Sequence, residues 1–177
     1  GDHSLFRKGY AFEGSSRIPM IISQAGSVKS KLEESPVVIE DLYPTILDLA
    51  GIKPLSDIDG VSLFPFCGDT GFLSDRDYIH GEHSKIYDKN EAMQFLTDGR
   101  EKYIWYTFSG QEQLFNLESD PNELKDLSFD PGSNGRLDFW RSRMIDHLAE
   151  RKEDGLSNGE KLISGILLPA VRASLKI

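Results

Sequence analysis

The dipeptide Asp98-Gly99 places the strongest constraint on how this chain can fold. It lies between two apolar runs, and Asp-Gly favours a type I′ turn, in which both central residues need a positive φ. Such a turn joins adjacent antiparallel strands, and Ser109-Gly110 marks the next turn along the chain. The expected strands are residues 78–80, 93–97, 102–108 and 113–117. The second half of the sequence therefore predicts an antiparallel four-stranded sheet.

Residues 136–151 carry the clearest helical pattern in the chain. Four apolar side chains recur at spacings of three or four residues, which places them on one face of a helix. They are Leu137, Trp140, Met144 and Leu148. Because such a stripe must be buried, we expect this helix to pack across the sheet, giving an α+β subdomain over residues 76–177.

The first part of the chain, residues 1–75, reads as the end of an α/β domain. Two short apolar runs predict buried strands, at residues 19–22 and 36–39. Asp41 is expected to cap a helix that carries Pro44 in its first turn. One face of that helix is apolar, formed by Leu42, Ile46, Leu49 and Ala50. A segment rich in Gly, Pro and Asp, residues 54–77, follows and marks the expected domain boundary.

Composition excludes several classes of partner. The formal net charge is -9 and the Lys and Arg residues are scattered, which argues against a nucleic-acid surface. No apolar stretch approaches the roughly 18 residues of a membrane span, so no membrane partner is expected. Apolar residues make up 38% of the chain, and the sequence begins without an initiator methionine. We expect missing sequence to complete part of the core, and we interpret the chain as the C-terminal piece of a longer protein.

Asp2, His3 and Lys8 form a polar group at the start of the chain. An Asp-His pair followed by a lysine suits an anionic ester, because a lysine ammonium meets an anion as a compact point charge. The residues alone leave two other interpretations open, a capped turn with a surface histidine and an ordinary solvated lysine. Hard cations take six or more oxygen ligands, and no second acidic cluster completes such a set, so no metal ligand is assigned.

The segment His80-Gly81-Glu82-His83 resembles a zinc motif in composition but not in spacing. On a strand, His80 and His83 point to opposite faces, whereas a helical zinc pair needs a spacing of four residues. Two interpretations remain. The imidazoles make local hydrogen bonds at a strand end, or they contact a substrate at the rim of a pocket. His147, on the predicted helix, is expected to be solvated.

Five segments follow one another in order over residues 1–150. Residues 1–9 read Gly-Asp-His-Ser-Leu-Phe-Arg-Lys-Gly, and residues 10–19 read Tyr-Ala-Phe-Glu-Gly-Ser-Ser-Arg-Ile-Pro. The third segment is the predicted helix of residues 41–51, Asp-Leu-Tyr-Pro-Thr-Ile-Leu-Asp-Leu-Ala-Gly. The fourth is Asp-Gly-Val-Ser-Leu at 59–63, and the fifth is Leu-Phe-Asn-Leu-Glu-Ser-Asp-Pro-Asn-Glu at 114–123. As an ordered set they resemble the C-terminal portion of type I, formylglycine-dependent sulfatases (arylsulfatases) of the alkaline-phosphatase-like superfamily.

This resemblance implies a fold and a site. The fold is the C-terminal end of an alkaline-phosphatase-like α/β domain, followed by the antiparallel sheet and helix. Lys8 matches the family's active-site lysine that holds a sulfate oxygen, and His3 orients the sulfate or meets the leaving oxygen. The gap from Asp2 to Lys8 is too short for Asp2-His3 to match the calcium ligands, so this pair resembles the second Asp-His of the family pattern. Glu13 and Arg17 are expected to brace the loop by an ion pair.

The resemblance also implies what lies outside the chain. Cys67 is followed by Gly-Asp-Thr-Gly, so the Cys-or-Ser-x-Pro-x-Arg motif that yields formylglycine is absent. The nucleophile and the calcium ligands are therefore expected upstream, and no cofactor is expected in this piece alone. The implied activity is hydrolysis of a sulfated small molecule or carbohydrate, with Lys8, His80 and His83 as substrate contacts. The alternatives are a phosphonate or phosphodiester hydrolase of the same superfamily and a non-catalytic subdomain or pseudoenzyme.

Overall fold

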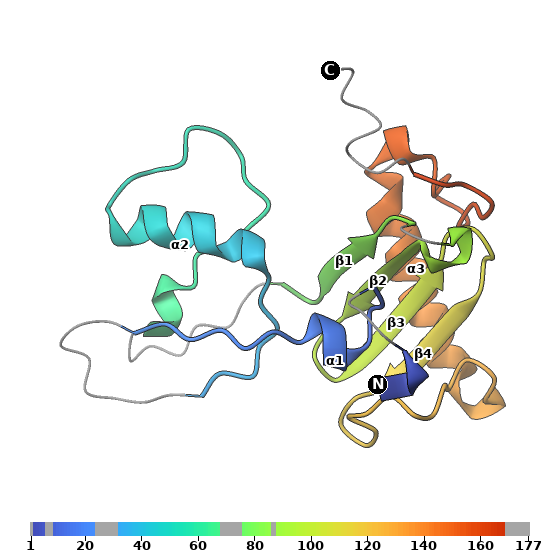
Figure 1. The fold of residues 1–177 in the computed structure, drawn as a ribbon. Helices are drawn as coiled ribbons and strands as arrows, with labels where there is room; N and C mark the ends of the chain where they lie inside the picture. Colours follow the sequence, from blue (N-terminus) through green and yellow to red (C-terminus); the bar gives the residue numbers. More distant parts are fainter. Residues whose placement is uncertain (1, 6–8, 24–31, 68–75, 86–87, 169–177) are drawn as a thin grey trace. The chain divides into compact units, whose positions relative to one another are not determined.

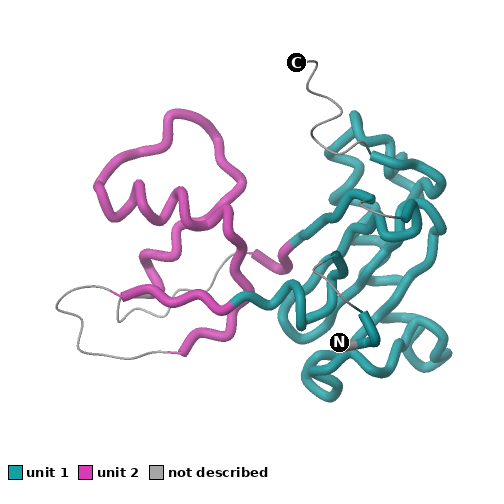
Figure 2. The backbone as a smooth tube through the Cα atoms, viewed as in Figure 1, with its two compact units in different colours: residues 1–18, 80–177 teal, residues 19–79 magenta. Residues whose placement is uncertain are grey.

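The computed structural model of this protein describes residues 2–5, 9–23, 32–67, 76–85 and 88–168. The chain forms two compact units, one of residues 1–18 with 80–177 and one of residues 19–79 (Figure 2). We call them unit 1 and unit 2. The first eighteen residues share a unit with the second half of the chain, so unit 1 joins segments that are far apart in sequence. The predicted domain division at residues 75 and 76 stays a prediction.

Unit 1 is built on a four-stranded sheet with the strand order β1-β2-β3-β4 (Figure 1). The strands are β1 (Ile79–His83), β2 (Met93–Thr97), β3 (Glu101–Tyr106) and β4 (Glu112–Asn116). β2 pairs with β3 in antiparallel register, with Met93 opposite Tyr106. β3 pairs with β4 in the same manner, with Glu101 opposite Asn116. The predicted antiparallel sheet is confirmed, and each strand lies close to its predicted position.

The hairpin between β2 and β3 forms as predicted, but its turn type differs. Thr97 pairs with Lys102, which leaves four residues in the connection and not the two of a type I′ turn. Gly99 has a φ of 87°, whereas Asp98 is not among the residues with positive φ in the described part of the chain. The Asp98 carboxylate instead accepts hydrogen bonds from the backbone N–H groups of Arg100 and Glu101, each at 2.8 Å. Asp98 thus closes the turn with its side chain.

The helix α3 (Asn134–Ala149) packs on one face of this sheet. Its buried residues are the predicted stripe, Leu137, Trp140, Met144 and Leu148. Met144 and Leu148 are fully buried, and Trp140 Nε1 donates a hydrogen bond to Glu101 Oε2 at 2.7 Å. The prediction of an amphipathic helix across the sheet is confirmed.

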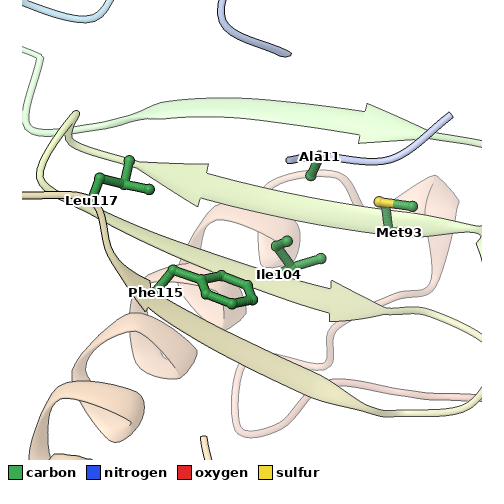
Figure 3. Packing of buried hydrophobic residues seen from close by; sticks show 5 residues of the cluster. All are labelled: Ala11, Met93, Ile104, Phe115 and Leu117. Carbon is green, nitrogen blue, oxygen red and sulfur yellow. The ribbon is translucent and has the colours of Figure 1, made fainter. Parts of the chain in front are cut away.

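The opposite face of the sheet is covered by the N-terminal segment, which includes the short helix α1 (Glu13–Ser16). Figure 3 shows the cluster on this face, with α3 behind the sheet. Its buried members are Ala11, Met93, Ile104, Phe115 and Leu117. The Phe95 ring packs against this cluster and lies directly over Gly81 of β1. Only glycine leaves room for it there, because a Cβ on Gly81 would lie 2.2 Å from Phe95 Cζ.

Unit 2 contains the predicted helix but not the predicted strands. The helix α2 (Leu42–Leu49) ends before Gly51, whose φ of 67° fits a helix C-terminus. Residues 19–22 and 36–38 have no regular secondary structure, so the prediction of two buried strands is wrong for them. Ile21 is 90% exposed. An apolar run becomes a buried strand only when neighbouring strands pair with it, and within the described residues these runs have no ladder partner.

Asp41 also differs from its prediction, because its side chain makes no capping hydrogen bond to α2. The carboxylate is fully buried and accepts hydrogen bonds from Val38 N and Val61 N, both at 2.9 Å, and from Arg76 at 2.7 and 3.0 Å. The Thr45 hydroxyl donates a hydrogen bond to the Asp41 carbonyl oxygen at 2.5 Å and accepts one from the Leu63 N–H at 2.8 Å. A polar hub around Asp41 therefore holds unit 2 together. No helix in the described part of the chain is long and apolar enough to cross a membrane.

Candidate functional site

The N-terminal turn, Asp2–Ser4, holds His3 in a conformation that is uncommon for a residue with a side chain. The φ of His3 is 55° and that of Ser4 is 58°, so two consecutive non-glycine residues occupy the left-handed region. The His3 ring stacks on Phe12, with centroids 4.1 Å apart and planes inclined by 12°. Phe12 in turn meets Phe115 edge to face at 5.8 Å. Non-glycine residues in this region concentrate at functional sites, which agrees with a specified position for His3.

Lys8, the predicted sulfate-binding residue, lies outside the described residues, and its neighbour Gly9 gives the nearest described position. A Cβ placed on Gly9 would lie 3.8 Å from Cε1 and 3.9 Å from Nε2 of His83. The backbone that continues from Lys8 therefore runs beside the His83 imidazole. Nδ1 of His83 is buried and has no hydrogen-bond partner among the described residues.

His80 lies on the other face of β1, as the strand geometry predicts. Its Nε2 forms a hydrogen bond with Gln94 Oε1 at 2.7 Å, and its ring lies 4.3 Å from that of His147 on α3. Burial, together with the nearby His147, lowers the pKa of His80 to about 4. The structure thus separates the two predicted substrate contacts. His83 lies beside the N-terminal segment, and His80 lies under α3.

His147 is not solvated as the sequence suggested. It is half-buried against His80, and burial lowers its pKa, with Arg151 acting in the same direction. Arg151 itself binds Glu82 of β1, with Nη1 and Oε2 2.7 Å apart. The two imidazoles therefore belong to the packing between β1 and α3, a long-range arrangement that the helical pattern around His147 does not show.

The residue that sequence reasoning missed is Lys102, whose side chain is completely buried. Its Nζ donates hydrogen bonds to Ala11 O at 2.6 Å, Glu13 Oε1 at 2.7 Å and Ser16 Oγ at 3.2 Å. The expected Glu13–Arg17 ion pair exists at 3.7 Å, but the Arg17 side chain is largely exposed. The sequence carried one signal. Lys102 alternates with Ile104 and Tyr106 on a strand, so a lysine occupies an apolar face.

No calcium site can be built from the described side chains. Among those residues, no group of three or more His, Cys, Asp and Glu side chains is placed to hold a metal ion. Calcium needs six to eight oxygen ligands, which this set does not supply. The location of the calcium ligands outside this chain stays a prediction.

Comparison with known proteins decides the family. Residues 1–150 match the family described as N-sulphoglucosamine sulphohydrolase, C-terminal. The chain belongs to this sulfatase family. It is 37% identical over 169 residues to an arylsulfatase of Clostridium perfringens, a match that covers 93% of this chain and 34% of the relative. The resemblance read from the five ordered segments is confirmed.

Solved structures agree with this family assignment. A 2-O GAG sulfatase matches 76% of this chain with a TM-score of 0.58 and 26% identity, and the match covers 32% of that structure. A phosphonate monoester hydrolase from Silicibacter pomeroyi matches 62% of this chain with a TM-score of 0.52 and 25% identity, over 24% of its own length. The chain thus spans about a third or less of the length of these proteins.

Proposed function

We propose that this chain is the C-terminal part of a sulfuric ester hydrolase and that it forms one wall of the catalytic centre. The observation that carries the proposal is the family match over residues 1–150, which includes both Lys8 and His3. The position of His3 on Phe12 and the approach of the Gly9 backbone to His83 support it. These contacts gather the start of the chain and the end of β1 within unit 1.

In this proposal each residue has a separate task. The Lys8 ammonium binds a sulfate oxygen and stabilises the charge that develops on the transferring group. His3 orients the sulfate or meets the leaving oxygen. His83 contacts the substrate from the end of β1, whereas His80 is left out because its Nε2 is bonded to Gln94. We further propose that the formylglycine nucleophile and the calcium ligands are contributed by sequence outside this chain.

The proposed substrate class is a sulfated carbohydrate or small molecule. A 2-O GAG sulfatase among the structural relatives supports the carbohydrate, and the arylsulfatase relative supports sulfate as the group removed. A second candidate is a phosphonate monoester hydrolase, because a protein of that activity shares the fold. The sulfatase is favoured by the higher identity and the larger covered share of the arylsulfatase match.

The test uses the full-length protein that contains this chain, assayed with an aryl sulfate and with an aryl phosphonate monoester. Lys8→Ala is expected to lower sulfate turnover on the order of a hundredfold, because a cation aimed at developing charge is worth about 3 kcal/mol in a dry site. Lys8→Arg should recover only part of the rate, since a planar guanidinium does not replace a compact ammonium.

The matched control is Lys125→Ala, which removes an exposed lysine and should leave turnover unchanged. Near-parental turnover by a folded Lys8→Ala variant would show that Lys8 is an ordinary loop residue. Faster turnover of the phosphonate than of the sulfate would favour the second candidate. The 177-residue chain alone is expected to be inactive on both substrates, because one lysine and one histidine do not replace a nucleophile and a metal.

A further inference from the structure

Lys102 is the one lysine among the described residues that is completely buried, and its ammonium group contacts two other segments, residues 11–16 and the turn at Glu123. Three N–H bonds point to Ala11 O, Glu13 Oε1 and Ser16 Oγ, all in the N-terminal segment. An ammonium has three protons, so the fourth neighbour, Glu123 Oε1 at 3.0 Å, forms an ion pair without a hydrogen bond of its own.

The cluster is closed by a direct link between its two acidic members. Glu123 Oε2 accepts a hydrogen bond from the backbone N–H of Glu13 at 2.5 Å, and the Glu123 side chain is almost completely buried. Glu123 also has a φ of 54°, an uncommon value for a residue with a side chain. Such a conformation persists only where the surroundings hold it, and here Lys102 and the Glu13 N–H do so.

A buried ion pair often adds no stability over well-packed apolar residues of similar volume, even when each proton of the lysine has a partner, so we look for the role of this cluster in the geometry that it fixes. A hydrophobic residue at position 102 would extend the apolar face that Ile104 already forms. A lysine differs from an apolar residue because its ammonium group makes directional hydrogen bonds. Its hydrogen bonds to Ala11, Glu13 and Ser16 have preferred directions and lengths, whereas apolar attraction is non-directional.

The fixed segment is the one that carries the candidate site. Phe12 follows Ala11 directly, and the His3 ring stacks on Phe12. Tyr10 precedes Ala11, and its hydroxyl donates a hydrogen bond to Glu91 at 3.3 Å. These neighbours connect Lys102 Nζ to the His3 ring through Ala11 and Phe12, although Lys102 itself does not contact the ring.

We propose that Lys102 is a positioning residue, which holds residues 11–16 through Glu13 and Glu123 and thereby sets the place of His3. The catalytic consequence rests on the proposed function, but the structural consequence does not. Lys102→Met keeps the length and apolar stem of the side chain and removes the cation. Glu123→Gln is the milder variant, because it keeps an acceptor oxygen for the Glu13 N–H and removes one charge.

The chain contains four histidines, and they report on the two faces of the sheet separately. His3 lies on the face covered by the N-terminal segment, whereas His80 and His147 lie on the α3 face. In a 177-residue chain with labelled histidine, Lys102→Met should move the His3 NMR signal toward that of an unstructured peptide and leave His80 and His147 in place. The matched control, Leu148→Ala, removes a buried residue of α3 and should move His80 and His147 but not His3.

A kinetic measurement in the full-length protein completes the test. Lys102→Met should lower kcat/KM for an aryl sulfate by about a hundredfold, because an error of about 1 Å in a catalytic group has effects of that size. Leu148→Ala, although destabilising, should leave kcat/KM near the parental value at a temperature where both variants are folded.

The outcomes separate the two proposals. A displaced His3 signal with no sulfatase activity in the parent would support the positioning role and contradict the proposed function. An unchanged His3 signal in folded Lys102→Met would overturn the positioning role, whatever the activity. If Lys102→Met fails to fold, Glu123→Gln decides the question by the same signal, with a smaller expected displacement, and an unchanged signal there overturns the proposal.

Discussion

The two units of this chain differ in how many apolar side chains they bury. Unit 1 buries aromatic and aliphatic residues on both faces of its sheet, and several are fully inaccessible, among them Leu96, Tyr103, Ile104, Met144 and Leu148. In unit 2, the buried residues within the described part of the chain are Asp41, Pro44, Thr45 and Leu63, of which two are polar. Most of the larger apolar side chains in the described part of unit 2 are exposed. They include Ile21, Leu32, Leu42, Tyr43, Ile46, Leu49 and Leu55.

This difference shows that an apolar helix face in the sequence does not by itself mean that the face is buried. The sequence predicts an apolar face for both α2 and α3, yet only that of α3 is buried. Unit 2 is held by the contacts of Asp41 and Thr45, which are directional and few. Unit 1 is held by apolar burial, which grows with area at about 25 cal/mol per Å². The two units should therefore respond differently to the same kind of change.

Loss of the Asp41 hub should have the largest effect. Asp41→Ala removes the carboxylate that Arg76 and the N–H groups of Val38 and Val61 bind, and breaking such a buried pair costs about 3–5 kcal/mol. Hydrogen exchange should show loss of protection at the amides of Val38 and Val61 and unchanged protection in β2–β4. Glu40→Ala, at the exposed carboxylate next to Asp41 in the sequence, is the control. Retained protection at both amides would contradict a polar hub.

A core deletion in unit 1 should have the next largest effect. Met144→Ala removes a fully buried side chain between α3 and the sheet, and such deletions cost about 2–5 kcal/mol. Urea unfolding followed by tryptophan fluorescence measures the loss, since Trp105 and Trp140 are both buried in unit 1. The control on the same helix is Ser142→Ala, at an exposed position. Equal stability of the two variants would mean that α3 is not part of a tightly packed core.

Acid should weaken unit 1 through His80. Its pKa is lowered to about 4, so between pH 4 and the ordinary value of 6.5 the unfolded chain binds more protons than the folded one. Stability therefore rises with pH in this window and is lost as the pH falls from 6.5, by about 2 kcal/mol between pH 7 and pH 5.

The test of this pH dependence is His80→Gln, which does not titrate. Urea unfolding of the parent and the variant at pH 7, 6 and 5 should give a shallower pH slope in the variant. The charged and titratable groups around His80 are His147, Glu82 and Arg151, and they remain in both proteins. Identical slopes would show that His80 takes up its proton in the folded state without cost.

The smallest expected effect compares one substitution in the two units. Ile104→Val removes a methyl group from a fully buried position and should cost about 1 kcal/mol. Ile46→Val does the same on α2, at a side chain that is 63% exposed, and should change stability by less than about 0.5 kcal/mol. Thermal unfolding of the two variants measures both. A cost at Ile46 equal to that at Ile104 would mean that the face of α2 is covered in solution.

The sequence by itself determined the elements whose signals are local. A turn at Asp98-Gly99 and a stripe at Leu137, Trp140, Met144 and Leu148 involve residues within a few positions of one another, so both could be read correctly. The family could also be read, because five short segments keep their order over residues 1–150. The type of the hairpin turn could not, because the register of the two strands fixes it.

Only the tertiary structure decided which side chains meet across long separations. Lys102 binds Ala11 from 91 positions away, and His80 contacts His147, which lies 67 positions further along the chain. Asp41 is of a residue type that often caps helices, yet its carboxylate binds Arg76, 35 positions away. Residues 19–22 look like a strand but lack the neighbours that a strand requires. Local patterns give an element its preference, whereas burial and pairing depend on which distant segments come to lie beside it.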